Sequence, residues 1–561
     1  MENTDNLENI NTQENKKENN TKKFDDIYNE KINKRIEKIK SWLKNPYNLS
    51  FLILFIIIII IRFYFFILTS NQPLWWDESQ YMSKAKDIAG IVKYDLGGPR
   101  TPFYSYILSL FFILNLDYEP FMRFVVLLIP SLLVILLIYL CIKEMYLDRK
   151  IAIISLVIAG LLWEHLFYSN RFHTENFSLI FLFLATLVLF KVYIKREKIL
   201  FIKPKYALVW IIVFFIISVL FRAGTIMAFP SLFLFILILN KDKLFYTKKG
   251  IFLSFILALL LILAIIYVPK MQISKPYIEF FYKPENPIAW HSLSVFKGFY
   301  QSYVPNFPSF LLYFFIIGII IFFFDLFLGY ERLLNIKLDD KNLNFKSDIF
   351  NFLTIFFILI TFIFLIRSPT IEYRWFFPLL IGMFSFTANG IIRSTEYVMS
   401  LIGIKNKIFV IIIIAIIVFL GAYDQFKHSE AIIKIKLDSY IQVKEAGLWI
   451  KQNSNKDDLI ISSSHPQTIY YSERNVETFY VNGSNENETA FNEYIKFKKP
   501  KFVIVSIFEP SFTPHWAYEW ANKNNQSVKP VRAYFLDQNK QQLALVIYEV
   551  DYSKFGIKNF S

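Results

Sequence analysis

The stretch FLILFIIIIIIRFYFFIL, residues 51–68, decides the fold class of this chain. It is an almost unbroken apolar run, near the length that crosses about 30 Å of hydrocarbon as a helix. Inside a bilayer no water is available to hydrogen-bond the backbone, so a run of this kind has to be helical. The stretch therefore predicts a membrane-spanning helix, and similar runs recur along the chain.

These recurring runs predict about eleven membrane-spanning helices and hence a polytopic α-helical membrane protein. The predicted spans are residues 50–69, 122–142, 151–169, 177–194, 206–222, 226–240, 250–268, 309–328, 350–367, 375–392 and 407–423. A further apolar stretch at residues 102–115, PFYSYILSLFFILN, is shorter. Its length fits an interfacial or re-entrant helix better than a span.

The distribution of basic residues predicts the orientation in the membrane. The net charge is +15, which in a soluble protein would suggest a nucleic-acid partner. In a membrane protein Lys and Arg gather in cytoplasmic loops, and no nucleic acid is needed to explain them. Counting 102–115 as a span would put the basic loop at 195–205 outside. We therefore expect a cytoplasmic N-terminus, an extracytoplasmic C-terminus and a location in the cell membrane.

Composition divides the chain into three predicted parts. Residues 1–48 form a cytoplasmic polar tail with a basic amphipathic helix, and residues 49–424 form the transmembrane domain, with a long first outer loop at 71–121. Residues 425–561 alternate helical and strand periods, which predicts an extracytoplasmic soluble α/β domain. The chain has one cysteine, Cys141, which excludes a disulfide framework and a cysteine metal cluster.

The first outer loop carries the leading candidate for chemistry, PLWWDESQYMSKAKDI. Asp77 and Glu78 lie just past the first span, beside Trp75 and Trp76. A carboxylate partly desolvated by tryptophan is a stronger base, so this pair suits general-base catalysis. The two tryptophans, together with Tyr81, are candidate contacts for a sugar or acceptor. The alternative interpretation is an aromatic belt with a solvated acidic pair.

Two later segments are expected on the same outer face. One is YSNRFHTENFSL at 168–179, with Arg171 and Glu175, and the other is RSPTIEYRWFFPLL at 367–380. Ordinary interfacial polarity and a snorkelling arginine would also explain them. The functional alternative is that arginines at the outer interface bind a lipid phosphate bidentately. Those candidate arginines are Arg100, Arg171, Arg222 and Arg374. Glu372, two positions before Arg374, is a further candidate contact for a sugar or acceptor.

The remaining motifs concern sugar contacts, metal ligands and other classes of enzyme. The outer loop 270–308 is rich in aromatic residues and contains His291, another candidate sugar contact. The six histidines show no metal-ligand spacing, so no metal site is predicted, although a divalent cation stays possible as a cofactor. The sequence contains no P-loop, dinucleotide fingerprint or nucleophile elbow.

Taken in order, these motifs resemble a known family. The order is WWDESQYMSKAKDI, RTPFYSYILSL, MRFVVLLIPSLLVILLIYL, SNRFHTENFSL and EYRWFFPLL, with a soluble α/β domain after the last span. The chain resembles the GT-C glycosyltransferases of the dolichyl-phosphate-mannose protein mannosyltransferase type, a superfamily that includes the lipid A aminoarabinose transferase. The resemblance covers most of residues 50–425.

The resemblance implies an inverting glycosyltransferase that moves one sugar from a polyprenyl or dolichyl monophosphate to a protein, lipid or glycan acceptor. Asp77 would be the catalytic base, with Glu78 beside it. Glu175 falls where many relatives have Asp, and Arg374 falls on the late arginine motif, here in the order Tyr-Arg. Residues 425–561 lack the WWDYG string of oligosaccharyltransferases, which favours a single-sugar transferase.

Two other classes of function stay open. A transporter or flippase of a lipid-linked substrate would carry repeated halves and charges near the bilayer midplane. No internal repeat is evident, and the candidate charges gather at one predicted face. A non-catalytic membrane assembly protein is the third class, and only the acidic pair of the first outer loop speaks against it.

Overall fold

A computed structural model describes most of the chain in two compact units, residues 1–57 and 58–561. The described residues are 28, 30, 32–97, 100–245, 247–248, 251–252, 297, 310–334, 336–364, 372–481, 484, 486–537 and 539–555. In the first unit residues 32–43 are helical and mostly exposed. Helix α2, Pro46–Thr69, begins in this unit and continues into the second.

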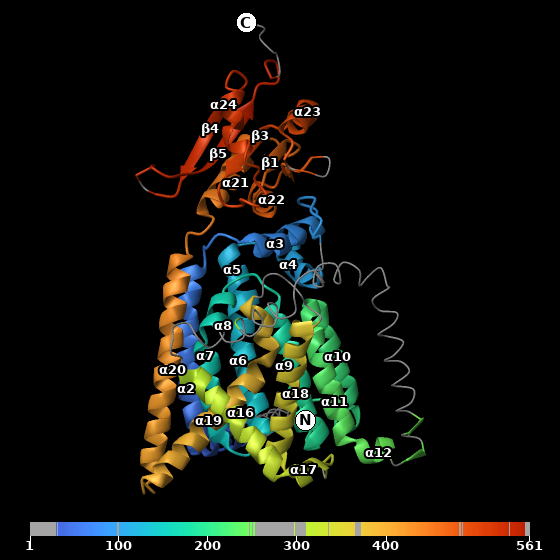
Figure 1. Ribbon diagram of the computed structural model, residues 1–561, viewed down its shortest axis with the longest axis vertical. Helices are drawn as coiled ribbons and strands as arrows, with labels where there is room; N and C mark the ends of the chain where they lie inside the picture. Colours follow the sequence, from blue (N-terminus) through green and yellow to red (C-terminus); the bar gives the residue numbers. More distant parts are fainter. Residues whose placement is uncertain are drawn as a thin grey trace, which may run out of the picture. The chain divides into compact units, whose positions relative to one another are not determined.

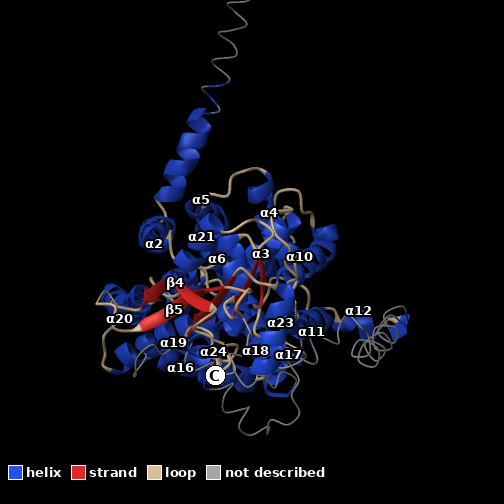
Figure 2. Ribbon diagram, turned by 90° about the horizontal axis from the view of Figure 1, so that it is seen from above, coloured by secondary structure: helices blue, strands red, loops and turns tan. Residues whose placement is uncertain are grey.

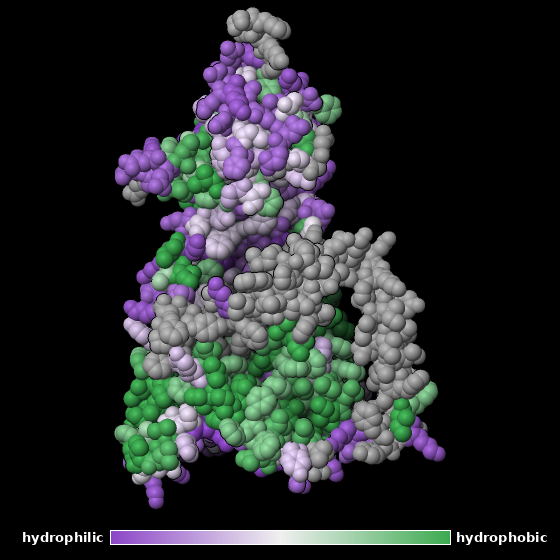
Figure 3. All heavy atoms as spheres, viewed as in Figure 1, coloured by the Kyte–Doolittle hydropathy of each residue, from purple (hydrophilic) through white to green (hydrophobic). Residues whose placement is uncertain are grey.

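The chain is a polytopic α-helical membrane protein. Among the described residues, eight helices are long and apolar enough to cross a bilayer. They are Pro46–Thr69, Glu119–Met145, Glu175–Ile194, Pro204–Phe221, Leu311–Leu328, Leu343–Ile363, Arg374–Leu401 and Lys407–Ile435. Each coincides with a predicted span. On the face shown in Figure 3, the surface over these helices is mainly hydrophobic and that of the C-terminal region is mainly hydrophilic.

The other three predicted spans are not among these eight helices. The stretch 151–169 is interrupted, because helix α7 (Arg149–Leu161) stops at Leu162, whose ψ of 120° breaks the helix before α8 (Trp163–Tyr168). The stretch 226–240 begins as a 3-10 turn and leaves only a short helix, α11 (Phe229–Leu239). The span at 250–268 lies outside the described residues.

Helices α6 (Ile129–Met145), α9 (Glu175–Leu187) and α19 (Leu380–Leu401) form the centre of the membrane bundle. In the most apolar part of the span Arg374–Leu401, which contains α19, 83% of the residues are buried inside the protein. The corresponding share for Pro46–Thr69, which is α2, is 17%. Residues 58–69 of α2 and helix α20 (Lys407–Ile435) lie side by side at the edge of the bundle in Figure 1, with apolar side chains facing outward.

Close approach of α19 to α16 (Phe310–Leu328) depends on two glycines. A Cβ atom at Gly318 would overlap the carbonyl of Phe386, and one at Gly390 would overlap the carbonyl of Phe314. Small residues let helix backbones touch where lipid gives no hydrophobic drive for association. This contact fixes the position of α19, whose N-terminal end carries part of the site described below.

The C-terminal region has an α/β fold, as predicted. Its five-stranded sheet has the order β2-β1-β3-β5-β4, with β1 parallel to β2 and β3, and β5 antiparallel to β3 and β4. The strands are Leu459–Ser462, Asn475–Glu477, Phe502–Ser506, Val528–Phe535 and Leu543–Val550. The helices beside them are α21 (Ile441–Asn453), α22 (His465–Ser472), α23 (Glu488–Lys498) and α24 (Ala517–Lys523) (Figure 1). Figure 2 shows β4 and β5 in red from above.

Residues 71–121, the predicted first outer loop, contact this region. They form α3 (Trp76–Ile88) and α4 (Phe103–Ile113), and α4 is the short apolar helix predicted at 102–115. Helix α22 packs on α3 (Figure 1), where Ser83 Oγ donates to the Pro466 carbonyl at 2.9 Å and Lys86 pairs with Glu473 at 2.6 Å. Because Asp77 lies in the first turn of α3, these contacts hold the predicted base in place.

Candidate functional site

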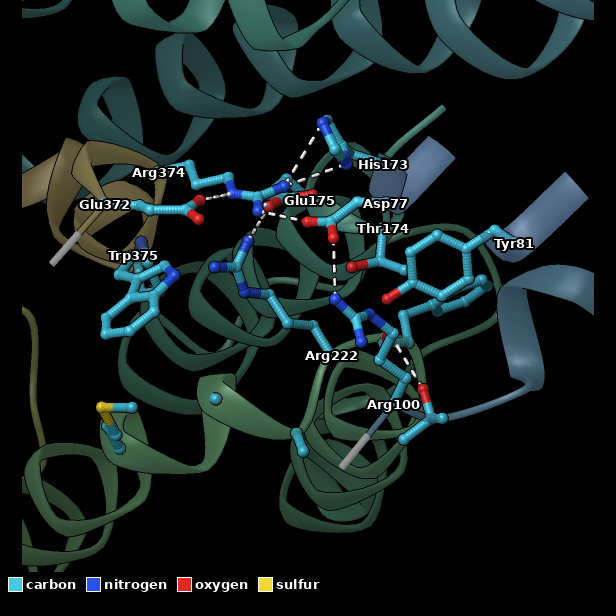
Figure 4. A pocket seen from close by; sticks show the side chains of 16 residues that line it. Asp77, Tyr81, Arg100, His173, Thr174, Glu175, Arg222, Glu372, Arg374 and Trp375 are labelled. Carbon is cyan, nitrogen blue, oxygen red and sulfur yellow. Dashed lines mark hydrogen bonds and ion pairs between the residues drawn. The ribbon is translucent and has the colours of Figure 1, made fainter. Parts of the chain in front are cut away.

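A cavity of about 200 Å³ brings together four segments that are far apart in the sequence. They are the start of α3 with the following loop, residues 173–175, the turn between α10 (Ala207–Phe221) and α11, and the 3-10 helix Tyr373–Leu379 with the residue before it. The lining residues are Asp77, Tyr81, Arg100, Thr101, His173, Thr174, Glu175, Phe221, Arg222, Ala223, Gly224, Met227, Glu372, Arg374, Trp375 and Pro378 (Figure 4).

Asp77 lies between two arginines in this cavity. Arg100 Nη2 donates to Asp77 Oδ1 at 2.7 Å, and Arg374 Nη2 donates to Asp77 Oδ2 at 2.5 Å. Burial by itself raises the pKa of the Asp77 carboxyl, but Arg374 and Arg100 outweigh burial and hold that pKa well below its usual range. Asp77 is therefore ionised at neutral pH, and both of its oxygens are occupied by guanidinium donors.

Arg374 is the centre of the charge network. Besides Asp77, its guanidinium pairs with Glu372, lies 3.6 Å from Glu175 and donates to His173 Nδ1 at 3.0 Å. The same nitrogen, Arg374 Nη1, also lies 3.3 Å from His173 Nε2, so it faces both ring nitrogens of His173. Burial, and then the charge of Arg374, lower the pKa of His173, which agrees with a neutral ring.

Glu175 completes the network from the opposite side. It is the first residue of α9 and pairs with Arg222, which lies in the turn before α11. The cavity thus holds three arginines, Arg100, Arg222 and Arg374, and three carboxylates, those of Asp77, Glu175 and Glu372. Figure 4 shows these charges alternating across the cavity. Their balance means that an entering anion has to displace carboxylates from arginines.

Glu78 and Arg171 were predicted beside these residues, but they are not among the residues that line the cavity. They form a buried ion pair of 3.1 Å in which the Glu78 and Arg171 side chains are 0% and 2% exposed. Glu78 also accepts hydrogen bonds from the backbone N–H groups of Trp75 and Phe172, both at 2.9 Å. Glu78 therefore ties the start of α3 to the segment that leads to His173 and Glu175.

The aromatic candidates are divided in the same way. Tyr81 lines the cavity, and burial and the Asp77 charge raise its pKa to about 12, so it is a neutral hydroxyl. Trp75 lies under the Arg171 guanidinium at 3.5 Å, and Trp76 stacks on Phe512 of the C-terminal region with ring centroids 5.0 Å apart. His291 lies outside the described residues.

Seven of the predicted site residues thus line one cavity. They are Asp77, Tyr81, Arg100, Glu175, Arg222, Glu372 and Arg374. Sequence reasoning assigned no role to His173 or Trp375, although both lie in the cavity wall. The signal for both was their adjacency to chosen residues, since His173 is two positions before Glu175 and Trp375 follows Arg374 directly. The chemical roles of all these residues stay predictions.

The described residues also form two further cavities. A small apolar cavity of about 20 Å³ lies between α9, α11, α18 (Leu343–Phe364) and α19, and it shares Pro378 with the charged cavity. A groove of about 500 Å³ lies between residues 93–95 and the C-terminal region, with His465, Val476 and Lys498 in its walls. Burial raises the pKa of Tyr94, which lines that groove, to about 12.

In the part of the chain that the structure describes, no group of three or more His, Cys, Asp or Glu side chains is arranged to hold a metal ion. The charges in the cavity pair instead with one another. The arrangement of donors and acceptors is therefore suited to binding an anion through arginines, with a carboxylate at hand to accept a proton.

The fold is similar to that of solved membrane transferases. The archaeal oligosaccharyltransferase AglB from Archaeoglobus fulgidus, in complex with an inhibitory peptide and a dolichol-phosphate, matches with a TM-score of 0.57 at 13% identity, over 92% of this chain and 76% of that chain. The apo form of the Archaeoglobus fulgidus oligosaccharyltransferase matches with a TM-score of 0.55 at 14% identity, over 83% and 70%.

ArnT from Cupriavidus metallidurans in the apo state matches with a TM-score of 0.49 at 9% identity, over 89% of this chain and 97% of that chain. No protein-family model and no curated protein sequence matches this chain. The two oligosaccharyltransferase structures establish the GT-C fold, which confirms the fold predicted from the sequence. At these identities the likeness concerns the fold and not the substrate.

Proposed function

We propose that this chain is an inverting glycosyltransferase that transfers a single sugar from a polyprenyl monophosphate to an acceptor at the outer face of the membrane. The observation that carries the proposal is the bridging of the Asp77 carboxylate by Arg100 and Arg374 inside one cavity. That cavity supplies both parts of the chemistry. A carboxylate takes a proton from the acceptor, and cations stabilise the phosphate as it departs.

The three arginines suit the phosphate of the donor. Guanidinium groups bind phosphate oxygens bidentately. Arg100, Arg222 and Arg374 reach the cavity from the first outer loop, the α10–α11 turn and the 3-10 helix before α19. The AglB structure from Archaeoglobus fulgidus holds a dolichol-phosphate, and the shared fold supports a lipid-phosphate carrier for this chain as well.

The small apolar cavity marks where the tail of a lipid carrier would leave the charged cavity. It shares Pro378 with the charged cavity and has Leu182, Phe183, Leu232 and Phe350 in its walls. Its volume of about 20 Å³ fits about one water molecule, so a lipid tail would have to widen it. A polyprenyl phosphate has this same division, a charged head attached to an apolar tail. We propose that the head lies among the arginines and that the first isoprene units enter beside Pro378.

Donor binding would free the base. In the absence of ligand both Asp77 oxygens accept from arginines. A phosphate that takes over the donors of Arg100 and Arg374 removes the interactions that hold the pKa of Asp77 low, and the burial that remains raises it. The same event that seats the donor thus makes Asp77 a better proton acceptor, so the base is activated only when there is a sugar to transfer.

The transfer step then balances as follows. Asp77 accepts the proton of the acceptor's O–H or N–H group, and the acceptor atom forms a bond to the anomeric carbon. The bond between that carbon and the phosphate oxygen breaks, and its electron pair stays on the phosphate, which the arginines stabilise. The acceptor approaches opposite to the departing phosphate, so the anomeric configuration inverts.

The groove beside Tyr94 is where we propose that the acceptor approaches. It is bounded by the loop after α3 and by the C-terminal region, and it is lined by charged residues of both signs, including Lys93, Asp95 and Glu477. Tyr94, which also lines this groove, belongs to the same loop as Arg100 of the charged cavity. The lining favours a hydrophilic acceptor, and the inhibitory peptide in the AglB structure is compatible with a polypeptide.

A test of the proposal compares purified wild-type protein with Asp77→Asn in bilayers that contain polyprenyl-phosphate sugars. The wild type should consume donor and release polyprenyl phosphate, and Asp77→Asn should lose about 10²–10⁴-fold in kcat, the usual contribution of a general base. Asp457→Asn, an exposed aspartate of the C-terminal region, is the matched control. A folded Asp77→Asn protein with full activity would remove the assignment of the base.

The same preparation separates the competing classes. A flippase would move fluorescent lipid-linked sugar between leaflets without releasing polyprenyl phosphate, and an assembly protein would do neither. Release of polyprenyl phosphate that requires Asp77 is expected only of a transferase.

A further inference from the structure

A buried arginine in the first membrane-spanning helix has no role in the proposed chemistry. Arg62 lies two turns before the end of α2, and its side chain is 2% exposed. Among the residues that the structure describes, no carboxylate forms an ion pair with it. A charged side chain inside a membrane span costs free energy, so such a residue usually has a functional role.

The partners of Arg62 all belong to the break between α7 and α8. Its Nη2 donates to the Gly160 carbonyl at 3.4 Å and to His165 Nδ1 at 2.8 Å, and its Nη1 donates to Ser169 Oγ at 3.0 Å. Because the helix stops at Leu162, the Gly160 carbonyl lacks the N–H donor that it would have in a continuous helix. Arg62 thus supplies a donor to the broken backbone and fixes α8 on α2.

The hydrogen bond from Arg62 settles the tautomer of His165. A guanidinium can only donate, so Nδ1 of His165 is the acceptor and the proton of the neutral ring lies on Nε2. That Nε2–H points to Asn176 Oδ1 at 3.2 Å. His165 is 1% exposed and Asn176 is 3% exposed, so neither bond competes with bulk water. The imidazole therefore links Arg62 to Asn176 through two hydrogen bonds.

The far end of this chain of hydrogen bonds touches the charged cavity from two sides. Asn176 directly follows Glu175 at the start of α9. The His165 ring packs edge-on against Phe377, with centroids 5.6 Å apart, in the 3-10 helix that carries Arg374. One turn further along α8, Tyr168 lies under the Arg374 guanidinium at 5.5 Å.

We propose that Arg62, His165 and Asn176 form a positioning relay that fixes Glu175 and Arg374 relative to each other. The relay rests on the proposed function, since its purpose is to keep both groups at the donor phosphate. None of the three residues is among those that line the cavity. They act through the backbone of α9 and through the packing of α8 on Phe377.

The first experiment examines the relay without any substrate. Protein labelled with ¹⁵N in its histidine rings contains six histidines, and the resonances absent from His165→Gln belong to His165. At neutral pH we expect a neutral ring with Nδ1 unprotonated and Nε2 protonated. A charged imidazolium, or a proton on Nδ1, would overturn the relay. Arg62→Met should let the two tautomers exchange, and an unchanged spectrum would also overturn it.

The second experiment measures transfer kinetics. Misplacing reacting groups by about 1 Å can cost on the order of 10²-fold in rate, so His165→Leu should lower kcat by about 10- to 100-fold with little change in KM for the donor. His165→Gln, whose amide both accepts and donates, should restore most of kcat. His515→Leu is the matched control, because His515 is exposed in the C-terminal region.

The two experiments distinguish a failure of the proposed function from a failure of the relay. If the wild type turns over no polyprenyl-phosphate sugar, the proposed function falls, and the ¹⁵N spectrum still decides whether the relay exists. If the wild type is active and a folded His165→Leu protein keeps full kcat, the relay has no positioning role. Equal impairment of His165→Gln and His165→Leu would also contradict it, provided that both proteins melt at the temperature of the wild type.

Discussion

Replacing Arg374 by lysine keeps the positive charge and removes the planar fork that the site uses. The Arg374 guanidinium donates to Asp77 at 2.5 Å, to His173 at 3.0 Å and to Glu372. A lysine ammonium is one point charge on a flexible stem and cannot reach all three directions at once. At least one hydrogen bond to a charged group is lost, which is worth about 1.5–3 kcal/mol.

That free energy corresponds to a fall of about 10- to 100-fold in kcat/KM for the polyprenyl-phosphate sugar. Arg374→Gln also removes the charge and should fall further, by about 10²–10³-fold, as when one preorganised donor to a developing negative charge is deleted. The assay is release of polyprenyl phosphate from a radiolabelled donor, with kcat and KM measured separately. Both constants should change, because the proposed function places Arg374 at the donor phosphate before and during transfer.

The matched control is Arg393→Lys. Arg393 belongs to the same span, Arg374–Leu401, but pairs with Asp325 away from the cavity and is largely exposed. It should keep the activity of the wild type. The reasoning is refuted if Arg374→Lys stays within about twofold of the wild type in both kcat and KM, since a difference that small is below the value of one charged hydrogen bond.

Three further predictions follow from the charges outside the membrane spans. Burial raises the pKa of Asp77 but Arg374 and Arg100 hold it low, so kcat/KM should show no acid limb above about pH 4. The acid limb of kcat should lie at higher pH because the donor phosphate occupies the arginines; coincident limbs would contradict donor-dependent release of the base. Lys86→Met removes the 2.6 Å pair with Glu473 that clamps α3 and should cost about 1.5–3 kcal/mol of stability; an unchanged melting temperature would refute the clamp. Burial raises the pKa of Glu509 from 4.5 to about 7, so the native state binds the extra proton and stability falls as pH rises from about 4.5 to 7. Glu509→Gln should therefore raise the melting temperature above pH 7 and not below pH 4.5, and the opposite pattern would be incompatible with a buried carboxyl.

Apolar periodicity and length identified the membrane-spanning helices because a bilayer leaves no alternative to a helix. The prediction of an unbroken span at 151–169 is wrong. This run is mostly apolar, with Glu164 and His165 near its end, but its helix breaks at Leu162, and the break is stabilised by Arg62, which is about 100 residues earlier in the chain. No local pattern in 151–169 reports a donor that arrives from another helix.

The candidate site was predictable in its residue types and less so in its contacts. Asp77, Glu175 and Arg374 were chosen because short polar motifs followed predicted spans on one face, and the structure brings them to one cavity. Glu78 looked equivalent to Asp77 in sequence. On a helix, however, adjacent residues point about 100° apart. Glu78 consequently turns into the protein and pairs with Arg171.

We infer the orientation of the chain in the membrane from its basic loops. Oligosaccharyltransferases share this fold, so the proposal of single-sugar transfer rests on the lack of a WWDYG string in residues 425–561.

A structure of this chain with a bound polyprenyl monophosphate tests the central claim most directly. We expect the phosphate within hydrogen-bonding distance of Arg100 and Arg374, the first isoprene units beside Pro378, and the Asp77 carboxylate released from both guanidinium groups. A lipid phosphate bound elsewhere, with both Asp77–arginine pairs intact, would contradict the account.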